Sequence, residues 1–229
     1  MEGCITIVGV AILFLLFLGG VPHGKAFTGG PGIFPINSKP YGYSYGEWSA
    51  KWWQWLASVP SSLNPVNDKT GSNCAQGQNG PVWFLAGSTG RPAVRTCTIP
   101  AGKALFFPAL TIECSYAEDS TLKTEAQLRS CALNGDQGGI AQVNIDGVNL
   151  QSLQTYKVQS PLFSFTFPQD NIFGARPGST QSVSDGIFVM LQPLTFGNHT
   201  VHFTGVVLAN PTLGTQSFAT DATYHLAVK

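Results

Sequence analysis

Two glutamates are the first residues whose surroundings suggest chemistry. Glu47 stands beside Trp48 in a Trp-rich segment, and Glu113 closes an apolar run. Glycosidases cleave sugars with two carboxyl groups that lie roughly 5–10 Å apart. The sequence does not bring the two together, and Glu47 equally suits the first turn of a helix, where an acid complements the helix dipole. A secreted glycan-active hydrolase using Glu47 or Glu113 is therefore an alternative hypothesis.

A histidine pair offers a second kind of chemistry. His202 and His225 fall in the last two strand-like runs, each on the polar face of its strand. If these strands pair antiparallel, both rings lie on one outer face, where two imidazoles and a third ligand hold copper or zinc. The sequence identifies no third ligand, so metal binding is the other alternative and no cofactor is expected. Asn198 begins an N-x-T sequon and is a glycosylation site if the host modifies such sites.

The tryptophans suggest binding more than catalysis. Trp48, Trp52 and Trp55 recur at i, i+4 and i+7, the spacing of a helix face that packs on a sheet. Trp53 falls off this stripe, so we expect it to be exposed and able to stack on a ligand. Trp53 and Glu47 are the candidate ligand-binding residues.

Two helices are predicted to position these side chains. The first spans about 46–58, with Ser44 as N-cap and Pro60 beyond its end. The second spans about 124–132, where Thr124 and Gln127 have the spacing of a capping box.

Most of the remaining chain reads as short strands. The runs are rich in β-branched and aromatic residues and are separated by Gly, Pro, Asn and Asp. Asp146-Gly147 and Asp185-Gly186 suit hairpin turns that need positive φ. We therefore expect a mainly β protein, an antiparallel β-sandwich with a jelly roll as one form, and two α-helices inserted in the N-terminal half. The runs are 82–86, 94–99, 104–112, 140–145, 155–159, 162–167, 187–191, 200–207 and 223–228.

The N-terminus predicts export. Residues 5–18 are uncharged and apolar, too short to span a bilayer but suited to a signal peptide that covers residues 1–26. Glu2 stands where a basic residue is usual, so an uncleaved anchor is the alternative. Residues 27–43 form a Gly/Pro-rich arm, and 44–229 a single disulfide-stapled domain without a stable membrane span after cleavage.

Cysteine usage agrees with export. Removing the leader leaves four cysteines, for which the local pairs Cys74–Cys97 and Cys114–Cys131 are favoured among three pairings. A zinc site is less consistent with the spacing, because there is no C-x2-C pair. Disulfides imply an oxidising compartment, so we expect a secreted, extracellular or cell-envelope protein.

Composition narrows the class of partner. Only 10% of the residues are charged, with 12 basic against 12 acidic, whereas 11% are aromatic. Nucleic-acid-binding proteins carry a basic excess, so that class is excluded. The first hypothesis is a non-catalytic binding or structural protein that recognises a neutral glycan or a protein partner through aromatic and amide side chains.

Several segments together resemble a known group. The chain is similar to a widespread, uncharacterised family of exported microbial β-sandwich proteins with a Trp-rich N-terminal helix and no known activity. The resemblance implies a fold and an exported location but no catalytic residue. It is carried by Tyr45-Gly46-Glu47-Trp48, Trp52-Trp53-Gln54-Trp55, Gly80-Pro81-Val82-Trp83-Phe84, Ile99-Pro100-Ala101-Gly102-Lys103, Asp146-Gly147, and the segments 197–203 and 222–226.

Overall fold

A computed structural model describes residues 32–229. The signal peptide predicted for residues 1–26 and the first part of the arm lie outside the described residues. From Gly32 the arm runs along strand β8 (Gly178–Leu191), because Phe34 N–H donates to the Met190 carbonyl and Gln192 N–H donates to the Gly32 carbonyl. Among the described residues, no helix is both long and apolar enough to cross a bilayer.

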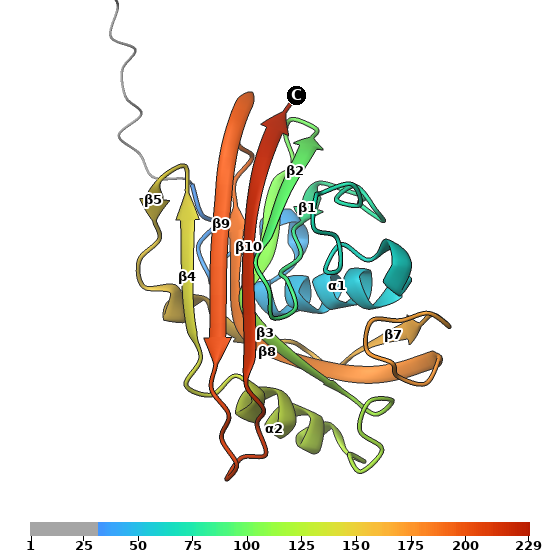
Figure 1. Ribbon diagram of the computed structural model, residues 1–229. Coiled ribbons are helices and arrows are strands. Elements are labelled where there is room, and N and C mark those ends of the chain that lie inside the picture. The colour runs from blue at the N-terminus through green and yellow to red at the C-terminus, as the bar shows by residue number, and fades with distance from the viewer. Residues whose placement is uncertain (1–31) are drawn as a thin grey trace, which may run out of the picture.

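The protein is mainly β, with two five-stranded sheets (Figure 1). Both sheets are mixed, because β1 pairs parallel with β3 and β2 pairs parallel with β10. The predicted sandwich is confirmed, but its purely antiparallel character is wrong. Sheet A contains β1 (Val82–Phe84), β3 (Ala104–Ser115), β8 (Gly178–Leu191), β6 (Lys157–Gln159) and β7 (Phe163–Phe167), and sheet B contains β2 (Ala93–Ile99), β10 (Phe218–Val228), β9 (Gly197–Val207), β4 (Ile140–Ile145) and β5 (Val148–Asn149).

Sheet A is buried on both faces. On one face Phe107 stacks on Phe203 of sheet B, with ring centroids 4.8 Å apart. On the other face Phe106 stacks on Phe188 at 5.3 Å, beneath helix α1 (Tyr45–Ser58). Sheet A therefore lies between sheet B and α1, which explains why β3 and the second half of β8 read as apolar runs.

Both helices begin as predicted. Ser44 and Glu47 form a complete capping box at α1, and Thr124 and Gln127 form one at α2 (Glu125–Gly135). Reciprocal capping bonds satisfy N–H groups that would otherwise lack partners at a helix start. Short 3-10 helices span Pro40–Gly42, Ser61–Leu63 and Leu153–Tyr156.

The two favoured disulfides are present. Cys74 bonds to Cys97 on β2, and Cys114 on β3 bonds to Cys131 on α2. The second bond fixes α2 against the end of sheet A, where Leu128 and Ala132 are buried. Each disulfide therefore ties a loop or helix to a strand.

The turn predictions had mixed outcomes. Asp146 and Gly147 have φ of 50° and 85° and connect β4 to β5, as predicted. Asp185 and Gly186 do not form a turn but lie inside β8, opposite Ile112 and Thr111. Gly186 is needed because a Cβ there would lie 2.4 Å from the Leu110 carbonyl oxygen, where β3 bulges.

Candidate functional site

Helix α1 carries four of the five tryptophans, and all four are buried. Their indole N–H groups are bonded internally: Trp48 to the Pro40 carbonyl at 2.9 Å and Trp52 to the Leu85 carbonyl at 3.0 Å. Trp53 donates to Thr111 Oγ1 at 3.2 Å and is only 7% exposed. The expected exposure of Trp53 is therefore wrong, because sheet A and the loop before β8 cover the helix face on which it lies.

A groove lies along one side of α1, with a volume of about 450 Å³. We call it the α1 groove. Its other wall is the loop that precedes β1, including Gly77, Asn79 and Gly80. Its lining includes the aromatic side chains of Tyr43, Trp48, Trp55 and Phe84 and the polar side chains of Lys51, Gln54 and Asn79.

The α1 groove combines rings, amides and one cation. Tyr43 is 40% exposed, and Lys51 Nζ lies 4.0 Å from the centre of its ring, a cation–π contact. Gln54 is held by a hydrogen bond from Nε2 to the Ser164 carbonyl at 2.9 Å. No carboxylate belongs to the lining among the described residues, so the groove lacks the paired acids that glycosidases need.

A second hollow lies on the other side of α1, with a volume of about 110 Å³. We call it the Trp53 pocket. Its lining is almost entirely apolar, and six separate segments contribute to it. These are α1 (Trp52, Trp53 and Leu56), Val66, the loop after β1 (Gly87, Ser88 and Thr89), β3 (Pro108, Leu110 and Thr111), the loop before β8 (Ile172 and Phe173) and the start of β10 (Phe218 and Thr220).

Arg95 fixes the walls of the Trp53 pocket. It is only 1% exposed and makes five hydrogen bonds, all to neutral oxygen atoms. Two of them reach the carbonyls of Val66 and Gly87, which both line the pocket. The sequence contained a signal for this residue, because Arg95 stands at an inward position of the alternating strand β2.

Glu47 is a helix-capping residue in this structure. Its carboxylate accepts hydrogen bonds of 2.7 Å from the backbone N–H and the hydroxyl group of Ser44. These hydrogen bonds hold the pKa of Glu47 below its ordinary value. Glu47 lines neither the α1 groove nor the Trp53 pocket.

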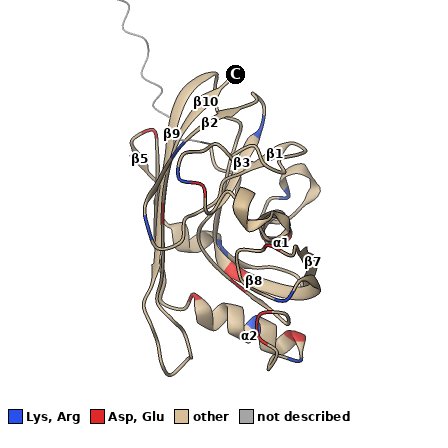
Figure 2. Cartoon of the chain, turned by 45° about the vertical axis from the view of Figure 1, so that its right-hand side comes forward, with Lys and Arg blue, Asp and Glu red and all other residues tan. Residues whose placement is uncertain are grey.

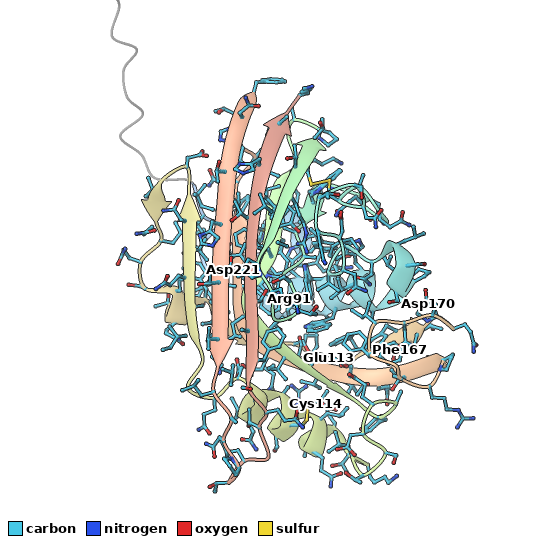
Figure 3. The ribbon with its side chains drawn as sticks, viewed as in Figure 1. Arg91, Glu113, Cys114, Phe167, Asp170 and Asp221 are labelled. Atoms are coloured by element: carbon cyan, nitrogen blue, oxygen red, sulfur yellow. A yellow bond between two sulfur atoms is a disulfide. The ribbon has the colours of Figure 1, made fainter. Side chains whose placement is uncertain are left out.

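Glu113 is a half-buried acid near the end of β3, next to Cys114 (Figure 3), and its Oε2 atom is buried. Ser182 donates a hydrogen bond to Oε1, and Oε2 has no hydrogen-bond partner among the described residues. Burial, and then the nearby Glu118 carboxyl group, raise the pKa of Glu113 well above its ordinary value. Glu113 also lines neither hollow, so the structure does not join it with Glu47 in either of them.

His202 and His225 share the outer face of sheet B. Strands β9 and β10 are antiparallel, but His202 lies opposite Thr223 and His225 opposite Thr200, so the two are offset. His202 Nε2 lies 3.1 Å from Oδ1 of Asp221 on β10, which Figure 3 labels. Residues 32–229 contain no group of three His, Cys, Asp or Glu placed to hold a metal ion. Asn198, also on β9, is exposed, and its glycosylation stays a prediction.

A buried ion cluster lies away from both hollows. Lys157 Nζ is 2.7 Å from Asp136 Oδ1 and 3.4 Å from Asp185 Oδ1. Burial raises the pKa of Asp136 to about 6 despite the opposing effect of Lys157. One ammonium group thus serves two buried carboxyl groups, which makes this cluster sensitive to pH.

Comparisons with known proteins give little more. No protein-family model matches the sequence, and no curated protein matches it at a significant level. Among solved structures, the chain is similar to PbICP-C, solved in complex with falcipain-2 (12% identity, TM-score 0.26, covering 66% of this chain and 100% of that chain). It is also similar to EhICP2, a cysteine protease inhibitor from Entamoeba histolytica (11% identity, TM-score 0.23, covering 65% and 96%). TM-scores this low do not establish a shared fold, so the binding and inhibition named for those proteins are not attributed to this chain.

Proposed function

We propose that the protein is a non-catalytic binding protein, working outside the cytoplasm, that takes a neutral glycan segment into the α1 groove. The observation that carries the proposal is the groove lining, in which the exposed ring of Tyr43 stands with two tryptophans and two amides. Sugars present apolar C–H faces that pack on aromatic rings, and hydroxyl groups that exchange hydrogen bonds with amides. The groove volume of about 450 Å³ lies in the range of roughly 300–1,000 Å³ typical of small-ligand sites.

Charge supports a neutral ligand. Lys51 is the one charged side chain in the groove lining, and its ammonium group already lies over the Tyr43 ring. Figure 2 shows few charged residues on the fold and no block of one sign. Long-range steering of a charged ligand needs such a block, so recognition here depends on contact.

The two disulfides support the location. Such bonds persist in oxidising compartments and are rare in the cytosol. They agree with the predicted signal peptide, which lies outside the described residues.

The proposal is tested by binding to immobilised neutral oligosaccharides of glucose, xylose, mannose and N-acetylglucosamine, followed by calorimetry on any that bind. We expect Tyr43→Ala to weaken binding about tenfold or more, because it removes the exposed aromatic surface of the groove. Tyr41→Ala is the matched control, since Tyr41 is 41% exposed but contacts Phe34 and does not line the groove. Failure of every neutral oligosaccharide to bind, or equal losses in the two variants, would reject the glycan site.

A further inference from the structure

The Trp53 pocket is a second unfilled space that the proposed glycan site does not use. Its walls are held in place from behind, because Arg95 bonds to the carbonyls of Val66 and Gly87. The wall at Gly87 is packed closely enough that a Cβ there would lie 2.5 Å from Thr220 Oγ1. A space of about 110 Å³ therefore persists between fixed walls, where a side chain cannot easily move to fill it.

Three of the four hydroxyl groups that line this space, those of Ser88, Thr111 and Thr220, make hydrogen bonds within the protein, and the fourth, on Thr89, belongs to an exposed residue. Thr111 Oγ1 donates to the Asp185 carbonyl at 2.9 Å and accepts from Trp53. Ser88 Oγ donates to the Asp221 carbonyl at 2.9 Å, and Thr220 Oγ1 accepts from Ser88 N–H at 2.8 Å. An ordered water needs two to four polar partners, which these walls do not supply, so an apolar occupant is favoured over water.

The volume of the Trp53 pocket limits the size of the molecule that it can bind. An apolar protein cavity of roughly 150 Å³ holds one benzene molecule. The Trp53 pocket is somewhat smaller but open on one side, where half-buried Val66, Ile172, Phe173 and Phe218 extend the apolar surface. It therefore has room for one ring or one branched alkyl group, with a substituent reaching the mouth.

We propose that the Trp53 pocket binds a small uncharged apolar molecule, an aromatic ring or branched alkyl group of about six carbons. The ligand lies against Trp52 and Trp53 on α1 and Leu110 on β3. Binding rests on exclusion of apolar surface from water and requires no charged group of the protein.

Benzene and pyrazine are the probes, because the two molecules have nearly the same shape. Pyrazine carries two ring nitrogens on opposite sides, so in either orientation it must bury one nitrogen in the apolar pocket, where the nitrogen loses its hydrogen bond to water. The readout is the set of indole N–H signals in an NMR titration. We expect benzene to shift the Trp52 and Trp53 signals and to leave Trp48, Trp55 and Trp83 unmoved, and pyrazine to bind at least about tenfold more weakly. Shifts in none or in all five indoles, or equal affinity for the two probes, would overturn the proposal.

Variants at the pocket mouth give an independent test. Val66→Phe fills the mouth and should weaken benzene binding about tenfold, and Ile172→Phe from the opposite loop should act in the same direction. Leu63→Phe is the matched control, because Leu63 ends the short 3-10 helix just before Val66 but is 46% exposed and does not line the pocket. If both filling variants keep the wild-type melting temperature and bind benzene as the control does, the ligand does not occupy this pocket.

Discussion

The two hollows beside α1 are built from the same helix yet differ in chemistry. Trp48 and Trp55 line the α1 groove, whereas Trp52 and Trp53 line the Trp53 pocket. The difference comes from the opposite walls. The groove faces a loop rich in Gly, Asn and Pro, whereas the pocket faces strand β3 and apolar loop residues. A tryptophan-rich helix therefore does not determine what its two sides bind, since the elements packed against it set the polarity.

Loss of Arg95, which holds the walls of the Trp53 pocket, should have a large effect on stability. Arg95→Met removes five hydrogen bonds and leaves the carbonyls of Val66, Asp68 and Gly87 without the donor that Arg95 supplies, so it should lower the free energy of unfolding by about 3 kcal/mol or more. The Ala86 carbonyl keeps a donor in the Tyr224 hydroxyl. Chemical denaturation measures the loss. Arg91→Met is the control, because Arg91 is exposed and should change stability by less than about 0.5 kcal/mol. Similar losses in both variants would contradict the role given to Arg95.

The stability of the protein should depend on pH between 4 and 7, whereas ligand binding should not. Asp136 has a folded pKa of about 6, above its ordinary 3.8, so the folded state holds the proton more tightly than the unfolded state. This contribution to stability is complete below about pH 4 and is lost as pH rises through 6. Between pH 4 and pH 7 this effect should lower the free energy of unfolding of the wild-type protein by on the order of 1–3 kcal/mol. Asp136→Asn should abolish that decrease.

The matched measurement is ligand binding over the same range. Neither hollow is lined by a carboxylate among the described residues, so we expect binding at both to stay nearly constant from pH 5 to 7.5. An unchanged stability profile in Asp136→Asn would refute the role of the ion cluster, and binding that follows the titration of Asp136 would refute its separation from the hollows.

Replacing the single cation of the α1 groove lining should change ligand affinity only slightly. Lys51→Gln removes one cation–π contact of about 0.5–1 kcal/mol, so affinity for a neutral oligosaccharide should change by less than about fivefold. Calorimetry at low and high salt checks this. A larger loss that depends on salt would indicate that the groove selects charged ligands.

Local signals predicted much of the fold. The capping residues Ser44 and Thr124 located both helix starts, and short sequence separation favoured both disulfides. Period-two alternation placed His202 on the polar face of its strand, and in the structure it lies on the outer face of β9 while its neighbours Val201 and Phe203 are buried. Each of these features depends on residues close in the chain.

Features that depend on distant segments were missed. The first half of β8 reads as polar, yet Ser182, Ser184 and Asp185 are buried there because β3 and β7 pair along it and α2 packs beside it. Trp53 was expected to be exposed because a helical stripe describes one face only, whereas Phe173, 120 positions later, covers a second. The Trp53 pocket could not be predicted, since it combines segments from Trp52 to Thr220. The α1 groove uses residues 43–84 only, but it depends on how the loop before β1 lies against the helix, which no local pattern gives.

One NMR titration tests directly whether the α1 groove recognises neutral sugars. The experiment adds a neutral oligosaccharide selected by the binding assay and follows the five indole N–H signals. We expect the Trp48 and Trp55 signals to shift with the ligand, while those of Trp52, Trp53 and Trp83 stay in place. Shifts of Trp52 and Trp53 without Trp48 and Trp55, or no shift at saturating oligosaccharide, would contradict this expectation.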